Sequence, residues 1–300
     1  MNSIQPWILA ARPKTLFATL APIIVGISLS YKMSNTINWG LTALILLSAV
    51  LLQIGSNYAN DAYDYLKGAD TKNRKGPKRM VQSGILSANS ILNAMYAIFI
   101  LSVLIGYFLA RIGGWPIIVI GLLSIVFAII YTAGPYPLAY NGLGEITVFI
   151  FFGIIATIGT LYLQIVNIDS YFNLFTLEVF VAASSVGLLN TAILVVNNLR
   201  DIDPDKLAGK KTLAVKFGNQ FACYEFALLL IINCLCYLWL AFQWKNYDLI
   251  IAGILIAIPS IYLIFKIFNY KHTDLNIILE RTAQLSFFNS IIFFVLIVLW

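Results

Sequence analysis

The sequence has few charged residues, three cysteines and a single histidine. Charged side chains make up 11% of the 300 residues, whereas 60% of the residues are hydrophobic and the mean hydropathy is +0.87. Ordinary soluble domains carry about 25% charged residues. This composition excludes a soluble globular domain and indicates an integral membrane protein.

The shortage of cysteine and histidine excludes several kinds of site. Cys223, Cys234 and Cys236 fall within one apolar segment, where neither a disulfide framework nor a metal knot is expected. His272 lies in a polar segment, where we expect it to be solvated. We therefore expect the cysteines to pack as small apolar residues, and we expect no zinc or copper site built from thiolates and imidazoles.

Long apolar segments recur nine times along the chain. Each is near the length of about 20 residues that a helix needs to cross the hydrocarbon core of a membrane. The sequence therefore predicts an all-α membrane protein of nine transmembrane helices, folded as a single domain over residues 1–300. The predicted helices cover residues 15–31, 38–60, 88–110, 115–133, 144–165, 176–198, 217–242, 247–268 and 282–300.

Basic residues are distributed unevenly between the two sides of these segments. Three of the 19, Lys32, Arg111 and Lys245, fall on one side, and the other 16 fall on the opposite side. The positive-inside rule then places the N-terminus in the cytoplasm and Trp300 outside, for a multi-pass protein of the inner or plasma membrane. Because the basic residues follow the membrane ends, the net charge of +6 requires no nucleic-acid partner.

Two clusters of acidic and amide side chains lie about 140 residues apart, each at the predicted cytoplasmic end of an apolar segment. Carboxylates at such positions cost free energy unless something compensates them, which favours a functional role. Spacings of three and four residues place the members of each cluster along one helical stripe. Pro204 should end the regular helix, so we expect Asp205 to extend from a turn. The first cluster contains Asn57, Asn60, Asp61, Asp64 and Asp70, and the second contains Asn197, Asn198, Asp201, Asp203 and Asp205.

All of these side chains are oxygen donors, which suit Mg²⁺. If both clusters faced one cavity, several carboxylates would have to take up protons at neutral pH unless cations compensated them. Lys and Arg residues follow each cluster, and Mg²⁺ is commonly shared with substrate phosphates, so the pattern is typical of a diphosphate clamp. A diphosphate held at a membrane surface suggests a substrate with a lipid tail, such as a prenyl diphosphate. The alternatives are that the acids are helix caps and loop residues, and that the basic residues are membrane anchors.

The motifs resemble those of the UbiA-type intramembrane aromatic prenyltransferases, and among these the 1,4-dihydroxy-2-naphthoate polyprenyltransferases of menaquinone synthesis. Two motifs carry the family resemblance, Asn60-Asp61-x-x-Asp64 and Asp201-x-x-x-Asp205. Further stretches carry the closer resemblance, among them Gly76-Pro77-Lys78-Arg79, Tyr131-Thr132-Ala133-Gly134-Pro135-Tyr136-Pro137-Leu138 and Gly209-Lys210-Lys211-Thr212. The resemblance implies a nine-helix bundle, a single prenyltransferase domain, whose active-site cavity opens to the cytoplasm.

The resemblance also implies roles for individual residues. Asn57, Asp61 and Asp64 would hold one Mg²⁺, and Asn197, Asp201 and Asp205 a second, with the four aspartates of these sets as the catalytic residues. The implied diphosphate ligands are Arg79, Lys210 and Lys211. Acceptor binding would fall to Arg12, Lys14, Tyr131 and Tyr136, although Arg12 and Lys14 are equally consistent with membrane anchors. Asn60, Asp70, Asn198 and Asp203 are secondary candidates.

The implied reaction transfers a polyprenyl group from an allylic polyprenyl diphosphate to 1,4-dihydroxy-2-naphthoate, with loss of carbon dioxide, to give demethylmenaquinol and then demethylmenaquinone. One alternative is an enzyme of the same fold that prenylates hydroxybenzoate, homogentisate, a porphyrin or a chlorin. Another is a cation transporter, which would more often place ionisable groups near the membrane midplane. The centres of the predicted helices are almost free of charge, which favours the enzyme.

Overall fold

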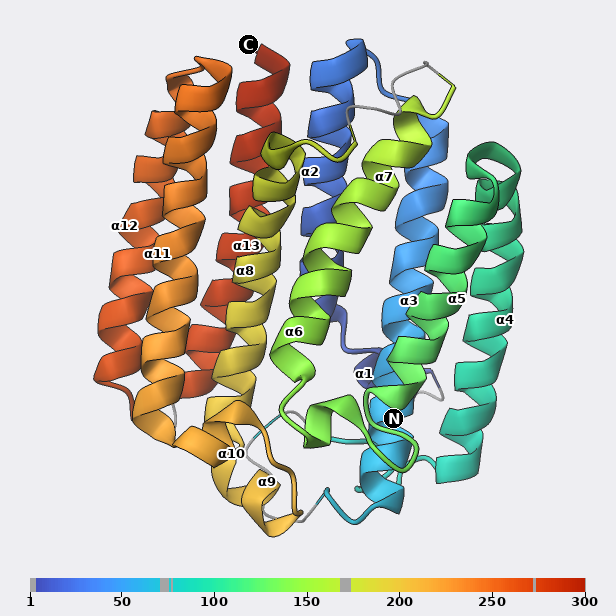
Figure 1. Ribbon diagram of the computed structural model, residues 1–300. Coiled ribbons are helices and arrows are strands. Elements are labelled where there is room, and N and C mark those ends of the chain that lie inside the picture. The colour runs from blue at the N-terminus through green and yellow to red at the C-terminus, as the bar shows by residue number, and fades with distance from the viewer. Residues whose placement is uncertain (1–3, 71–75, 77, 168–173, 272–273, 300) are drawn as a thin grey trace.

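The computed structural model describes residues 4–70, 76, 78–167, 174–271 and 274–299, and in these ranges the regular structure is helical throughout. Figure 1 shows long helices packed side by side as one bundle, with short helices gathered at one end. The long helices are α2 (Leu16–Ser34), α3 (Trp39–Leu66), α4 (Ala88–Gly113), α5 (Trp115–Ile130), α8 (Leu177–Arg200), α11 (Asn219–Trp244), α12 (Asp248–Phe268) and α13 (Leu275–Leu299). One further crossing is built from α6 (Gly144–Phe149), η3 (Ile150–Ile155) and α7 (Ala156–Ile165).

The predicted all-α membrane fold is confirmed. In the described residues eight helical segments are long and apolar enough to cross a membrane, and α5 adds a shorter apolar helix of 16 residues. Two boundaries differ from the prediction by more than three residues. Helix α3 continues past residue 60 to Leu66, so the first acidic cluster is helical up to Asp64. Helix α13 begins at Leu275, not at residue 282, because its first turns, although they carry Asn276, Glu280 and Arg281, bury Leu275 and Ile278 in the core.

Local sequence signals explain where several helices begin and end. The side chains of Asn38, Ser87 and Thr176 accept hydrogen bonds from the first backbone amides of α3, α4 and α8. Gly114 has a φ of 68°, in the region that favours glycine, and it makes the sharp turn between α4 and α5. The predicted break between the third and fourth segments is therefore confirmed.

The fifth crossing contains a feature that hydropathy did not predict. Residues Ile150–Ile155 form a wide π-helical turn, η3, between α6 and α7. This turn packs directly on α8, where a Cβ added to Gly153 would lie 2.6 Å from the Cα of Gly187. The two glycines therefore allow the backbones of the two crossings to approach closely.

Helix α8 forms the centre of the bundle and positions the functional end of the molecule. It packs against α2, α11 and α13 and against the η3 turn. In the most apolar 18 residues of α8, 72% are buried, compared with 22% in the corresponding stretch of α4. At its end the chain continues into α9 (Ile202–Leu207) and α10 (Leu213–Phe217). These lie at the same end of the bundle as the N-terminal helix α1 (Gln5–Ala11), together with η1 (Pro13–Thr15) and η2 (Leu138–Tyr140), while the C-terminus lies at the opposite end (Figure 1).

Candidate functional site

A cavity of about 650 Å³ runs between the helices and receives side chains from both acidic clusters. Most of its wall is apolar and comes from α2, α3, α5, the η3 crossing and α8. The predicted site residues gather at the end where α3 and α8 terminate. Those that line the cavity are Arg12, Asn57, Asn60, Asp64, Arg79, Tyr131, Asn197, Asn198, Asp201, Asp205 and Lys210.

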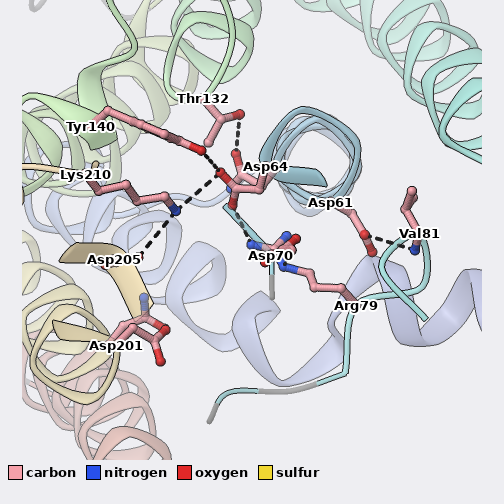
Figure 2. A network of polar contacts seen from close by, with 12 residues as sticks. Asp61, Asp64, Asp70, Arg79, Val81, Thr132, Tyr140, Asp201, Asp205 and Lys210 are labelled. Atoms are coloured by element: carbon pink, nitrogen blue, oxygen red, sulfur yellow. Dashed lines mark hydrogen bonds and ion pairs between the residues drawn. The ribbon is translucent and has the colours of Figure 1, made fainter. Parts of the chain in front are cut away.

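Lys210 joins the two clusters. Its Nζ lies 3.3 Å from Oδ1 of Asp64, at the end of α3, and 3.6 Å from Oδ1 of Asp205, on α9 (Figure 2). The ammonium group also lies 4.7 Å from the centre of the Tyr140 ring, which is a favourable cation–π arrangement. The backbone amide of Lys210 donates to the carbonyl of Asp205, so the α9 turn holds this lysine in place. Two acidic clusters far apart in the sequence therefore share one cation.

Asp64 is bound from three directions. Its side chain accepts hydrogen bonds from Nη2 of Arg79 and from the hydroxyl of Tyr140, both at 2.8 Å, in addition to the ion pair with Lys210. Asp64 is only 2% exposed. Burial of the phenol and the nearby Asp64 carboxylate raise the pKa of Tyr140 well above its usual value. Tyr140 therefore stays protonated and keeps donating to Asp64.

Arg79 ties the segment after α3 back onto the helix end. Besides Asp64, its Nε lies 3.5 Å from Oδ2 of Asp70, and the guanidinium is buried. Burial alone would lower the pKa of Arg79, but the carboxylates of Asp64 and Asp70 raise it above its usual value. Arg79 was predicted to bind diphosphate. The structure places it at the cavity wall with carboxylates as its partners, where it neutralises buried negative charge.

Asp61, which was predicted to hold a metal ion, is not among the described residues that line the cavity. Its two carboxylate oxygens accept hydrogen bonds from the backbone amides of Met80 and Val81, at 3.1 and 3.2 Å (Figure 2). Three residues of an α-helix place Asp61 about 60° around the axis from Asp64. That rotation directs Asp61 to the segment that follows Arg79 and leaves Asp64 facing the cavity. The structure thus assigns Asp61 a part in holding that segment on α3.

The second cluster is organised by Arg200, which the sequence analysis did not select. Its guanidinium donates to Oδ1 of Asn197 at 2.7 Å and to both oxygens of Asp201 at 2.9 and 2.6 Å. It also donates to Asn276 at 3.0 Å, which links α8 to α13. A Cβ on Gly76 would lie 2.7 Å from Nη2 of Arg200, so a larger residue there would displace the guanidinium. A basic residue directly before Asp201, at the end of a helix whose other charged residue is Glu178 in the first turn, was the available signal.

Several amide side chains of the clusters tie helices together. Asn57 donates to the carbonyl of Ala11 at 2.9 Å and to Oγ1 of Thr15 at 3.1 Å, which fixes the N-terminal segment against α3. Asn60 accepts a hydrogen bond from Thr132 at 3.0 Å. Asn198 donates to Oε1 of the buried Glu145 at 2.8 Å. These bonds hold the rim of the cavity in position.

Other predicted site residues lie elsewhere. Tyr136 is 62% exposed, Asp203 and Lys211 are also exposed, and none of the three is among the described residues that line the cavity. The side chain of Lys14 lies outside what the structure describes. Asp205 does line the cavity, but it belongs to a helix and not to a turn. The expected break occurs earlier, since α8 ends at Arg200 and Pro204 is tolerated in the first turn of α9.

The donor chemistry of the cavity fits Mg²⁺, although the carboxylates are not gathered around one point. Asp64, Asp201 and Asp205 present oxygen atoms, as do the amides of Asn57 and Asn197, and the three cysteines lie in α11. Within the described ranges no three acidic, histidine or cysteine side chains cluster as a ready metal centre. The basic groups of Lys210, Arg79 and Arg200 instead contact the carboxylates.

The sequence matches the UbiA prenyltransferase family over residues 19–291. The chain belongs to this family. The eight long apolar helical segments within its described residues, together with its family membership, make it a multi-pass membrane protein. The family resemblance seen in the motifs is thereby confirmed.

Two relatives and one solved structure illustrate the similarity. The 1,4-dihydroxy-2-naphthoate octaprenyltransferase of Haemophilus influenzae is 38% identical, over 97% of this chain and 95% of the relative. The protein of the same name from Escherichia coli is 36% identical, over 79% of this chain and 76% of the relative. A UbiA homolog from Archaeoglobus fulgidus, solved bound to DMAPP and Mg²⁺, superposes with a TM-score of 0.69 at 18% identity, covering 97% of this chain and 98% of the homolog. The last comparison shows a shared fold.

Proposed function

We propose that this UbiA-family chain transfers a polyprenyl group from an allylic polyprenyl diphosphate to 1,4-dihydroxy-2-naphthoate. The observation that carries the proposal is the meeting of Asp64, Asp205 and Lys210 at the mouth of an apolar cavity. A relative that is 38% identical over nearly the whole chain bears the name of this activity. The whole chain, residues 1–300, acts as one prenyltransferase domain.

Mg²⁺ is the proposed cofactor, with two ions as in the sequence-based hypothesis. The residues that would hold it are Asp64, Asp201 and Asp205, with amide oxygens of Asn57 and Asn197. This set omits Asp61, which bonds to backbone amides. When bound, the ions would neutralise the diphosphate and the charge that develops as it leaves. A UbiA homolog solved with Mg²⁺ and DMAPP supports this part of the proposal.

Lys210 and Arg79 would hold the diphosphate from the protein side. Lys210 is the better placed of the two, because its side chain is 12% exposed and lies between the clusters. A cation in this position stabilises the negative charge on the leaving oxygen. On the acceptor side, Arg12 and Tyr131 line the same cavity, and a guanidinium suits the naphthoate carboxylate.

The apolar wall completes the chemistry. The allylic carbon–oxygen bond breaks, the diphosphate leaves with the bonding electrons, and the resulting cation must be kept from water. The carbon that bears the carboxylate attacks this cation, a carbon–carbon bond forms, and carbon dioxide departs as the ring regains aromaticity. The hydroxyl groups of the ring keep their protons, and the product is demethylmenaquinol; its later conversion to demethylmenaquinone is a separate step that requires a two-electron oxidant.

The basic residues support an orientation for the molecule. The end that carries α9, α10 and the acidic clusters would face the cytoplasm, and the C-terminus would lie outside, in the inner or plasma membrane.

A product assay tests the proposal. Membranes containing the chain would receive Mg²⁺, a radiolabelled prenyl diphosphate and either dihydroxynaphthoate or hydroxybenzoate, with EDTA as the control. We expect EDTA-sensitive prenylation of the naphthoate alone. Prenylation of hydroxybenzoate instead would overturn the acceptor assignment, and the absence of product from both acceptors would overturn the function.

A further inference from the structure

A buried asparagine in the apolar part of the cavity makes bonds that neither acidic cluster uses. Asn190, on α8, is 3% exposed and lines the cavity. It precedes Asn197 by seven residues, which places it about 10 Å deeper along the helix than the acidic cluster. A polar side chain at such a depth in a membrane protein needs partners, and it marks a point of structural or functional importance.

The amide nitrogen of Asn190 satisfies two backbone carbonyls on different crossings. It donates to the carbonyl of Ala18 on α2 and to the carbonyl of Phe152 in η3, both at 2.9 Å. In a regular helix the carbonyl of Ala18 would accept from the amide four residues later, but that residue is Pro22, which has no N–H. Asn190 therefore supplies a donor that the proline removes.

The second carbonyl belongs to the π-helical turn. Single wide turns of this kind occur often at functional sites. Here the turn is fixed to α8 at two points, the contact between Gly153 and Gly187 and, one helical turn further along α8, the bond from Asn190 to Phe152. The orientation of the amide is itself fixed, because its Oδ1 accepts from the hydroxyl of Ser286 on α13 at 2.9 Å.

The backbone held in this way carries part of the cavity wall. Pro22 on α2 lines the cavity, and so do Phe151 and Phe152 in the wide turn. The ring of Phe151 lies 4.8 Å from that of Phe127 on α5, which also lines the cavity, so the turn determines where two aromatic rings stand. Removing the donor would leave two carbonyls without this partner in a medium that cannot solvate them, and the turn would shift.

We infer that Asn190 is a positioning residue for the prenyl tail: by holding α2 and the wide turn of the fifth crossing, it shapes the apolar channel and sets the preference for long donors. This inference rests on the proposed function, which places the diphosphate at the acidic clusters. A dimethylallyl group is shorter than the depth of Asn190, whereas a geranylgeranyl tail extends past it. Loss of Asn190 therefore weakens binding of the long donor selectively.

The test compares the dissociation constants of two unreactive analogues, dimethylallyl and geranylgeranyl thiodiphosphate, with purified full-length protein and Mg²⁺. For Asn190→Leu we expect the affinity for the long analogue to fall by about 10-fold relative to the short one. Asn233→Leu is the matched control. Asn233 is a buried asparagine of α11 that donates to Ser185 and is not among the described residues of the cavity wall, so its loss should leave the ratio unchanged.

A second variant separates positioning from direct contact with the tail. Pro22→Ala returns an amide donor to the carbonyl of Ala18, so in the Asn190→Leu background it should restore part of the lost preference. If Asn190→Leu does not fold, Ser286→Ala provides a milder loosening of the amide, with a smaller shift in the same direction. Equal weakening of both analogues, the same shift in Asn233→Leu, or no recovery on adding Pro22→Ala would overturn the inference. Product formation by the wild type is a separate measurement, so failure of the proposed function is recognised independently.

Discussion

The side chain of Asp64 connects three parts of the molecule that are distant in the sequence. Arg79 follows α3, Tyr140 belongs to η2, and Lys210 follows α9, yet all three contact this carboxylate. Breaking a buried pair of this kind by removing one partner is costly, because it leaves a charge uncompensated. Function and stability are therefore coupled at Asp64, and variants here need both to be measured.

We predict that Asp64→Asn and Asp61→Asn fail in different ways. Asp64→Asn should lower turnover by more than about 100-fold, since even the outer partners of a metal site cost about 10–100-fold. Asp61→Asn should mainly lower stability, by about 1–3 kcal/mol, because its amide cannot accept from both Met80 and Val81. Turnover measured as a function of Mg²⁺ concentration checks the first expectation, and thermal unfolding in detergent checks the second. If the Mg²⁺ concentration at half-maximal turnover rose equally in the two variants, Asp61 would be a metal ligand after all.

Tyr140→Phe tests the hydrogen bond to Asp64 without changing charge. The raised pKa keeps the phenol protonated at every pH up to well above its ordinary titration range, so the bond is present throughout the working range. We expect a loss of about 10-fold in turnover and a higher Mg²⁺ concentration at half-maximal rate. The ratio of variant to wild-type turnover should be the same at every pH from about 6 to about 9. A variant that matches the wild type in Mg²⁺ titration would show that the phenol does not position Asp64.

The residues that the sequence could predict were those with a charge and a periodic spacing. Asp64, Asp205 and Lys210 stood out in this way, and the structure brings them together. Tyr140 was missed because its role comes from a contact with Asp64 of another helix, and Arg200 was missed although its position directly before Asp201 offered a local signal. Spacings of three and four placed Asp61 on the same stripe as Asp64, and the contact with the segment after Arg79 decides which of the two faces the cavity.

At the level of helices and turns, hydropathy predicted the crossings well, and caps such as Asn38 and Ser87 account for their starts. It could not predict the π-helical turn, because that feature depends on Gly153 meeting Gly187 of another crossing and on a donor from Asn190. It likewise missed the start of α13, whose first turns carry the exposed Asn276, Glu280 and Arg281 but bury Leu275 and Ile278 in the bundle.

Gly153→Ala should destabilise the bundle. The new Cβ would lie 2.6 Å from the Cα of Gly187, and backbone atoms cannot move aside as a flexible side chain can. We expect a loss of about 1–3 kcal/mol, seen as a lower midpoint of thermal unfolding in detergent. Gly159→Ala is the control on the same crossing, since its Cβ would meet only a side-chain atom of Ile120 at 3.8 Å. Unchanged midpoints for both variants would show that the two crossings do not pack closely.

Considered as a whole, the molecule is polar at one end and apolar along its length. Single cysteines at Lys206 and Lys245, both exposed and at opposite ends of the bundle, would report on its orientation in cells. With the native cysteines replaced, a membrane-impermeant thiol reagent should label the Lys245→Cys variant from outside and the Lys206→Cys variant only after the membrane is opened. The reverse pattern would invert the proposed topology.

Asp64 and Asp205 lie 141 residues apart in the sequence, yet the proposed function requires them to belong to one Mg²⁺-dependent diphosphate site. Calorimetric binding of geranylgeranyl thiodiphosphate to the wild type, Asp64→Asn, Asp205→Asn and the double variant tests this requirement directly, with Mg²⁺ or with EDTA. We predict binding only with Mg²⁺, a loss of at least about 10-fold in each single variant, and a double variant little worse than either, because groups of one site are not additive. Binding unaffected by EDTA, or fully additive losses, would contradict the account.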